Sequence, residues 1–284
     1  MSKNLKIRIG DVSISIEGDF QKSNWEIVPA YRPFIWLGKI DMSLRLHQGA
    51  PDALVGEKVF DCHPIWTLYR QNGTSAIRIF HKLSEPERTL VLPRHLEKAD
   101  LYFADKSCRP VDPFYGPTME LLMVNYLAQG RGVIIHSCGI ERNREGILFV
   151  GESGAGKTTL ARMWGDEKGV DVLSDDRIIV RKKGGHFWMY GTPWHGDSRF
   201  ASPKGVRLER VFFLRHGQKN SIKEIKGIDP VLQLLTCSFP THWDSQGMAF
   251  TLEMLADLTS EVPCQELTFK PEKSVIDFVE QHTK

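Results

Sequence analysis

Cysteine is scarce in this 284-residue sequence, and no two cysteines have the close spacing of a zinc site or a redox motif. The cysteines lie far apart and are odd in number: Cys62, Cys108, Cys138, Cys237 and Cys264. This usage disfavours both a disulfide framework and a cysteine-based zinc site. A reducing, cytoplasmic environment is therefore the simplest expectation.

The sequence also lacks long apolar runs and an excess of charge of one sign. No stretch approaches the length of a membrane span, and the N-terminus has no apolar core typical of a signal peptide. The formal net charge is +2, and no basic run is longer than the three residues 181–183. We therefore expect neither a membrane nor a nucleic acid among the partners.

The remaining composition is that of an ordinary globular protein with a core of normal size. Hydrophobic residues make up 41% of the chain and charged residues 25%. The length suits one large domain or two ordinary ones. A connector rich in proline and glycine at 109–117 favours two. We place a β-rich N-terminal domain at 1–112 and an α/β domain at 113–284.

Alternation of apolar and polar residues predicts strands throughout the N-terminal part. Strands are expected at 6–9, 12–16, 66–69, 76–79, 88–92 and 100–103. The first four form two hairpins, and Asn72-Gly73 supplies the positive φ angles that the second tight turn requires. Several strands are amphipathic, as in antiparallel sheets with one face toward water. No group of catalytic residue types stands out in this region.

The C-terminal part mixes strand and helix patterns. Strands are expected at 133–136, 146–150, 169–173, 178–180, 187–190, 211–214 and 264–269. Helices are expected at 119–128, 160–164, 230–235, 248–258 and 272–281. The first two of these strands are joined by a connection too short for a parallel crossover, so we expect them to form a hairpin.

One stretch between a predicted strand and a predicted helix fits the phosphate-binding pattern G-x-x-x-x-G-K-[ST]. Its nucleotide-binding residues are expected to be Gly151, Glu152, Ser153, Gly154, Ala155, Gly156, Lys157, Thr158 and Thr159. We call residues 151–156 the glycine loop. Its glycines allow backbone N–H groups to turn toward phosphate oxygens, and the following helix N-terminus adds a partial positive charge.

The residues after the glycine loop suit a nucleotide triphosphate with Mg²⁺. Lys157 can reach the β- and γ-phosphates, and the Thr158 hydroxyl can hold Mg²⁺. The guanine-specific pattern Asn-Lys-x-Asp is absent, which favours ATP. A glycine-rich turn that only joins strand to helix would leave the lysine and the hydroxyl unexplained.

Two adjacent carboxylates, Asp175 and Asp176, follow the next predicted strand. Phosphoryl transfer to an alcohol uses one carboxylate to hold Mg²⁺ and benefits from another that accepts the alcohol proton. Adjacent side chains at a strand end point in different directions, so each can serve one role. Since a single short helix separates Lys157 from Asp175, we expect the aspartate strand close beside the strand that feeds the glycine loop. The alternative is an exposed acidic turn.

Two later loops carry residue types suited to a substrate site. In the first, Trp194 can stack on a base, His195 can contact phosphate, and Arg199 can neutralise charge in the transition state. A plain surface loop is the alternative for this segment. The aromatic loop at 238–244 suits either packing or a substrate lip.

The order His136, short hairpin, Gly-x-Ser-Gly-x-Gly-Lys-Thr, single helix and Leu-Ser-Asp-Asp resembles the HPr kinase/phosphorylase family and its kinase-like relatives. The resemblance covers roughly 132–190. It implies a mixed, twisted α/β sheet, related to that of phosphoenolpyruvate carboxykinase, with the phosphate loop between strand and helix. The Glu-x-Arg-Gly-Leu-Gly segment of the bifunctional members is absent here. The resemblance therefore leaves a reverse, phosphorolytic reaction open.

The resemblance also implies roles for individual residues. Lys157 would clamp the phosphates, Thr158 and Asp175 would hold Mg²⁺, and Asp175 or Asp176 would be the general base. His136 would lie near the transferred phosphoryl group. These assignments leave open which of the two aspartates takes which role.

Together these features predict a kinase that transfers the ATP γ-phosphoryl group to a hydroxyl with the help of Mg²⁺. The acceptor is a serine of a peptide or protein, or a small-molecule alcohol, and a homo-oligomer is possible. One alternative is an ATPase or GTPase that couples hydrolysis to a change of shape. Another is a regulatory module that binds nucleotide without catalysis.

Overall fold

The computed structural model describes residues 3–18, 27–51, 56–80, 85–104, 112–114 and 116–282. Cys108 and part of the connector at the expected boundary lie outside these ranges. The chain forms two compact units. The first comprises Met1–Arg8 with Val12–Tyr126, and the second comprises Ile9–Asp11 with Leu127–Lys284.

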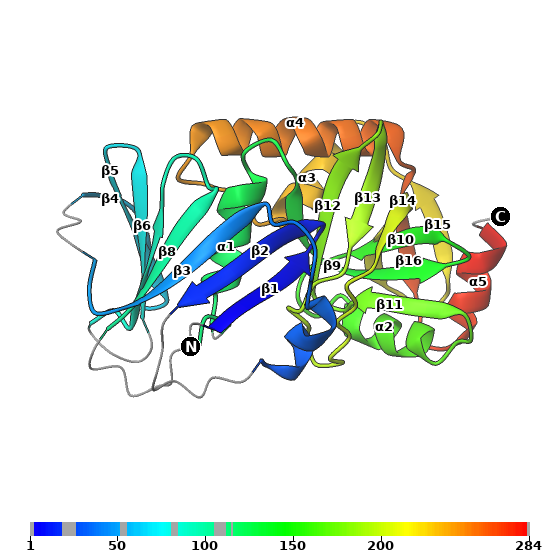
Figure 1. Cartoon of the computed structure of the whole chain (residues 1–284). Coiled ribbons are helices and arrows are strands. Elements are labelled where there is room, and N and C mark those ends of the chain that lie inside the picture. Colours follow the sequence, from blue (N-terminus) through cyan, green and yellow to red (C-terminus); the bar gives the residue numbers. More distant parts are fainter. Residues whose placement is uncertain are drawn as a thin grey trace. The chain divides into compact units, whose positions relative to one another are not determined.

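The first unit contains one large sheet in the order β1-β2-β3-β8-β7-β6-β5-β4 (Figure 1). Its strands are β1 (Lys3–Ile9), β2 (Val12–Gly18), β3 (Met42–Gln48), β4 (Glu57–Cys62), β5 (Trp66–Gln71), β6 (Thr74–Ile79), β7 (Arg88–Leu92) and β8 (Lys98–Phe103). Both expected hairpins are confirmed. Asn72 and Gly73 have φ angles of 48° and 76° at the β5–β6 turn.

Strand β3 departs from the expected antiparallel arrangement, because it pairs parallel with both β2 and β8. Its alternate residues Met42, Leu44 and Leu46 are buried, so a period-2 signal was present in the sequence. The parallel pairing depends on partners distant in the chain, which local patterns do not reveal. The 3-10 helix η1 (Pro29–Phe34) and all but the last residue of the helix α1 (Thr118–Leu127) also belong to this unit.

The second unit is built on a mixed sheet in the order β10-β9-β12-β13-β14-β16-β15, with β11 paired to β9. Its strands are β9 (Val133–Arg142), β10 (Glu145–Val150), β11 (Val170–Ser174), β12 (Arg177–Lys183), β13 (His186–Tyr190), β14 (Gly205–His216), β15 (Ser221–Glu224) and β16 (Cys264–Phe269). The expected β9–β10 hairpin is confirmed. Because β10 also pairs parallel with β14, the strands β9, β12, β13, β14 and β10 form a closed ring.

The aspartate strand does not lie directly beside the strand that feeds the glycine loop, which corrects the expectation. Strand β9 stands between them: β10 pairs with one edge of β9, while β11 and β12 pair with the other. The strand that follows the helix α2 (Lys157–Gly165) is therefore separated from β10 by one strand, β9, which carries His136.

Helices cover both faces of this sheet (Figure 1). They are α2 (Lys157–Gly165), α3 (Asp229–Thr236), α4 (Ser245–Glu261) and α5 (Ser274–His282). Successive residues of β10 point to opposite faces of the sheet. Leu148 packs in the core with α3 and α4, and Phe149 packs in the core with α2 and α5. Of the helices in the described ranges, none has the length and apolar character needed to cross a membrane.

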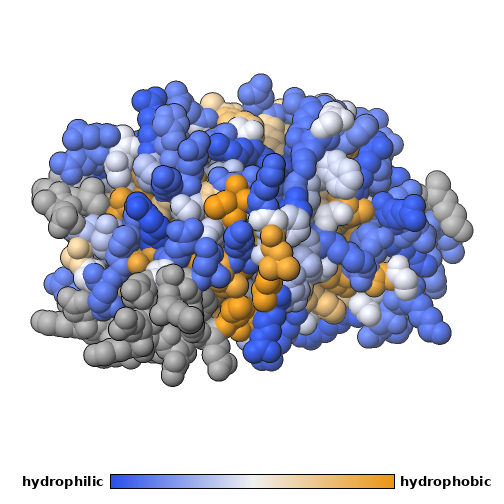
Figure 2. Space-filling model, in the orientation of Figure 1, coloured by the Kyte–Doolittle hydropathy of each residue, from blue (hydrophilic) through white to orange (hydrophobic). Residues whose placement is uncertain are grey.

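Hydrophilic residues cover most of the face seen in Figure 2, and apolar residues form smaller groups among them. Most apolar side chains of the strands are buried instead, on one face of β3 and on both faces of β10. The large apolar residues that remain exposed include Leu37 in the first unit and Ile228 in the second.

Candidate active site

Strand register brings the end of β10 and the aspartate pair to the same end of the sheet. Val150, the last residue of β10, lies opposite Ser137 on β9. On the other side of β9, the Ser137 N–H donates to the Asp176 carbonyl oxygen over 3.0 Å. Two strand spacings of about 4.8 Å place the start of the glycine loop roughly 10 Å from the aspartates.

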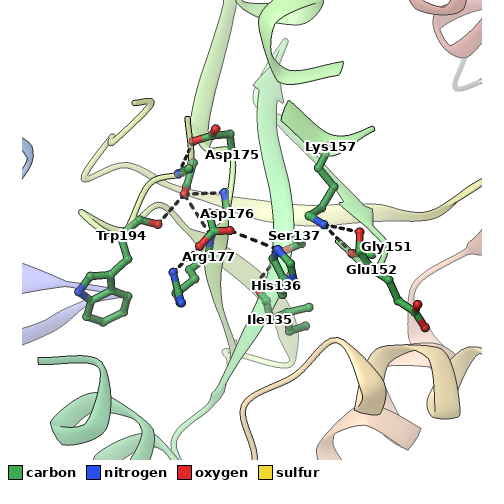
Figure 3. Close-up of polar contacts among 12 residues, drawn as sticks. Ile135, His136, Ser137, Gly151, Glu152, Lys157, Asp175, Asp176, Arg177 and Trp194 are labelled. Atoms are coloured by element: carbon green, nitrogen blue, oxygen red, sulfur yellow. Dashed lines mark hydrogen bonds and ion pairs between the residues drawn. The ribbon is translucent and has the colours of Figure 1, made fainter. Parts of the chain in front are cut away.

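The glycine loop, the start of α2 and the aspartate pair line one cleft of about 340 Å³. Its lining residues are His136, Ser153, Gly154, Gly156, Lys157, Thr158, Thr159, Asp175, Asp176, Gly196 and Asp197. Figure 3 shows His136 between Lys157 on one side and Asp176 on the other. The structure thus brings together the four residues expected to be catalytic.

The glycine loop has a backbone that requires glycine at two positions. Gly154 and Gly156 have φ angles of 85° and 95°. At Gly156 an added Cβ would also lie 2.7 Å from the Cζ atom of the buried Phe269 ring. Gly156 is the N-cap residue of α2, and no side chain caps this helix end. The first N–H groups of α2 are thus left to interact with a ligand or with water.

Lys157 folds back onto the loop that precedes it. Its Nζ donates to the carbonyl oxygens of Gly151 and Glu152, over 2.6 and 2.9 Å. The residue is only 6% exposed, and this burial lowers the pKa of Lys157, an effect that the nearby charge of Asp176 partly offsets. Among the described residues, no carboxylate forms an ion pair with this ammonium group. Its hydrogen bonds in the described part of the chain go to backbone carbonyl oxygens.

Asp175 holds the loop that follows β13. The side chain is 1% exposed, and its two oxygens accept the backbone N–H groups of Gly196 and Ser198, over 2.9 and 3.0 Å. Gly196 and Asp197 line the cleft as a result. Each Asp175 oxygen has a further lone pair beyond the one that accepts an N–H.

Asp176 points in a different direction, toward β9 (Figure 3). Its Oδ1 lies 3.2 Å from Nε2 of His136, its Oδ2 pairs with Nη1 of Arg177, and its side chain is 24% exposed. Burial raises the pKa of Asp176, but the hydrogen bond from His136 and the charges of Arg177, His136 and Lys157 outweigh it. The pKa lies below the ordinary value, so this carboxyl is ionised at neutral pH.

Several residues that sequence reasoning did not single out support the aspartates. The Ser174 hydroxyl accepts the N–H groups of Asp176 and Arg177, both over 3.3 Å. Thr192 donates its hydroxyl proton to the Arg177 carbonyl over 2.7 Å. Ser174 precedes the aspartates in the Leu-Ser-Asp-Asp stretch, which was an available signal. Thr192 gave none, because it lies 15 residues beyond its partner.

The aromatic loop at 238–244 begins next to the site. The guanidinium carbon of Arg177 lies 5.1 Å from the centre of the Phe239 ring, which is 37% exposed. Cys237, just before this loop, accepts the His136 backbone N–H over 2.6 Å. Phe239 therefore packs against a residue that itself contacts Asp176.

The residues expected to contact substrate phosphate, His195 and Arg199, flank Gly196 and Asp197 but do not line the cleft. Nδ1 of His195 lies 2.9 Å from the Gly196 carbonyl oxygen. Arg199 has a φ of 58°, and its N–H also donates to Gly196. Trp194 is buried. In this structure the His195 side chain and the Arg199 backbone N–H both contact the Gly196 carbonyl, and a role in binding substrate stays a prediction.

No group of three or more His, Cys, Asp or Glu side chains in the described ranges is arranged to hold a metal ion. The residues expected to bind Mg²⁺, Thr158 and Asp175, do line the same cleft. They offer oxygen atoms only.

Comparison with known proteins gives little beyond this geometry. No protein-family model and no curated protein matches the chain. Among solved structures, the Hpr(Ser) kinase/phosphatase from Coxiella burnetii is similar, with 13% sequence identity and a TM-score of 0.31. The match covers 52% of this chain and 95% of the other. It is a weak structural neighbour, and a likeness of this size carries no argument about the site.

Proposed function

We propose that this protein is a kinase that transfers the γ-phosphoryl group of ATP to a hydroxyl with the help of Mg²⁺. The observation that carries the proposal is the single cleft shared by Lys157, His136 and Asp176. One wall of this cleft offers a buried cation and free helix N–H groups, and the other offers an ionised carboxylate.

The glycine loop fits the phosphates of a nucleotide. The Lys157 ammonium is buried against carbonyl dipoles, and an anion would compensate its charge far better. The uncapped N-terminus of α2 lies in the same wall, and helix N-termini bind anions. Cβ atoms at Gly154 and Gly156 would strain the left-handed backbone that forms this cradle.

The donor set of the cleft also fits Mg²⁺. Thr158 supplies a hydroxyl and Asp175 a carboxylate whose oxygens retain lone pairs. Mg²⁺ prefers oxygen ligands and takes only one or two carboxylates when phosphates complete its shell. When bound, the ion neutralises charge on the phosphate oxygens.

We assign the two aspartates different roles. Asp175 is 1% exposed, and its oxygens accept backbone N–H groups of the 196–198 loop, whereas the Asp176 side chain is 24% exposed and pairs with the side chains of His136 and Arg177. Asp176 therefore accepts the proton of the acceptor hydroxyl. As the new P–O bond forms, the bond from the γ-phosphorus to the bridging oxygen breaks and ADP leaves.

The other residues of the cleft stabilise this transfer. Lys157 balances the charge on the phosphoryl oxygens, since phosphoryl transfer depends on positioning and electrostatics. His136 helps to lower the pKa of Asp176 and holds its carboxylate through the contact between Nε2 and Oδ1. The 196–198 loop, fixed by Asp175, forms the part of the cleft wall next to the aspartates.

A transfer assay tests the proposal directly. The protein is incubated with γ-labelled ATP and Mg²⁺ and screened against serine, serine-containing peptides and the metabolites of a cell extract. Label is expected on a hydroxyl acceptor, and Lys157→Ala is expected to slow its transfer on the order of a thousandfold. ATP consumed equally well by the variant, or turnover with water alone, would reject the kinase assignment. Tight ATP binding with no turnover would favour a non-catalytic module.

A further inference from the structure

Strand β14 reaches beyond the end of β10 and runs alongside the glycine loop. The two strands are parallel, and Val150 of β10 lies opposite Phe213. The chain then enters the glycine loop from β10, while β14 continues for three more residues to His216. This register places the His216 side chain level with the middle of the loop.

His216 forms a hydrogen bond to the backbone of the glycine loop. Its Nε2 lies 2.7 Å from the carbonyl oxygen of Gly154. A carbonyl oxygen only accepts, so Nε2 carries the proton and donates. The imidazole also stacks on Phe269 at the end of β16, with ring centres 6.2 Å apart, and this same Phe269 ring packs against Gly156.

A chain of hydrogen bonds connects His216 to Lys157. The peptide group between Gly154 and Ala155 is held at both ends, because the Ala155 N–H donates to the Glu152 carbonyl over 3.1 Å. The Glu152 carbonyl also accepts a proton of Lys157 Nζ over 2.9 Å. The turn at 152–155 is thus fixed between the imidazole and the ammonium group.

We propose that His216 is a positioning residue for the glycine loop, and hence for the nucleotide phosphates. It does not line the cleft; it holds the Gly154 carbonyl on the outer side of the loop and so fixes the orientation of this peptide. The expected effect on ATP binding rests on the proposed function, whereas the expected effect on the order of the glycine loop does not depend on any ligand.

Three variants separate the hydrogen bond from the ring packing. His216→Phe keeps an aromatic ring against Phe269 and removes the donor, whereas His216→Gln restores an N–H donor. His186→Phe is the matched control, because His186 is exposed at the start of β13 and lines no part of the cleft. Circular dichroism confirms that each variant is folded.

The first measurement is amide hydrogen exchange of residues 151–156 without nucleotide. We expect faster exchange in His216→Phe, wild-type exchange in His186→Phe, and partial recovery in His216→Gln. The second is equilibrium binding of ATP with Mg²⁺, where loss of one hydrogen bond weakens affinity about threefold to tenfold in His216→Phe. In the transfer assay the KM for ATP rises by a similar factor while kcat changes little.

The outcomes distinguish this inference from the proposed function. If the wild-type protein binds no ATP, the proposed function fails, and with it the role in placing phosphates; the exchange data then test loop positioning alone. If wild-type ATP binding is normal and His216→Phe matches it in both exchange and affinity, the positioning role is wrong and the kinase proposal stands. Equal defects in His216→Phe and His216→Gln would also contradict the hydrogen-bond argument.

Discussion

The two walls of the cleft are built in different ways. The Lys157 wall is one continuous segment in which backbone groups form the proposed binding surface. The Asp176 wall is assembled from the turn between β11 and β12, the middle of β9 and the 196–198 loop, and its side chains carry the proposed chemistry. A contiguous wall can be recognised in a sequence, whereas the division of roles in an assembled wall appears only in three dimensions.

The largest effect that would sharpen this comparison is expected from Lys157→Ala. Under the proposed function this change removes a charged donor to the phosphates, which is expected to slow transfer on the order of a thousandfold and to weaken ATP binding. The measurements are label transfer and ATP titration calorimetry. Lys204→Ala, which removes an exposed lysine that pairs with Asp171 outside the cleft, is the control. Wild-type affinity in Lys157→Ala would remove the lysine from the binding wall.

Asp175→Asn is expected to damage the architecture of the assembled wall. An asparagine cannot accept N–H bonds from both Gly196 and Ser198 without turning an NH₂ group toward one of them. An unsatisfied buried N–H costs about 1–3 kcal/mol, and urea unfolding should show this loss in the free energy of unfolding. An unchanged midpoint would show that Asp175 does not anchor the loop.

A smaller effect on stability is expected to differ between two glycines of the Lys157 wall. Alanine at either Gly154 or Gly156 costs about 1–2 kcal/mol for the left-handed backbone. Only Gly156 also faces the buried Phe269 ring at 2.7 Å, while nothing lies within 4 Å of a Cβ at Gly154. Gly156→Ala should therefore lower the unfolding midpoint more than Gly154→Ala. Equal midpoints would contradict the close packing of the loop.

The smallest predicted effect concerns the ionisation of Asp176. Burial raises its pKa and His136 is the first of the groups that lower it, so His136→Ala should raise this pKa. The pKa of Asp176 is lower in the folded protein than its ordinary value of 3.8. The ionised carboxyl therefore stabilises the fold at pH values above 3.8, and this stabilisation is lost as the pH falls through the folded-state pKa. Carbon-13 NMR titration of the carboxyl groups measures the shift. His195→Ala, which leaves Asp176 untouched, should not move it.

The elements of the second unit were largely predictable because their patterns are local. The β9–β10 hairpin, the loop with its helix, and the helices α3, α4 and α5 all follow from periodicity and turn residues. Strand β3 was missed although its residues alternate. The position of the aspartates across β9 required sheet order, which depends on partners far apart in the chain.

The residues of the candidate site could be predicted from the sequence, but the different roles of the two aspartates could not. Lys157, His136 and the aspartates were named by residue type and order, and they line one cleft. Asp175 and Asp176 are adjacent, so only the contacts with Gly196, Ser198, His136 and Arg177 distinguish them. His216 lies 62 residues from the carbonyl that it contacts, and no local signal connects the two.

The most direct test of the central claim is single-turnover transfer by Asp176→Asn beside Asp175→Asn, with ATP affinity measured on the same samples. Loss of the proton acceptor should slow transfer about a hundredfold or more in Asp176→Asn, with ATP affinity unchanged. Transfer by Asp176→Asn at the wild-type rate, under conditions where Lys157→Ala is inactive, would contradict the role assigned to Asp176.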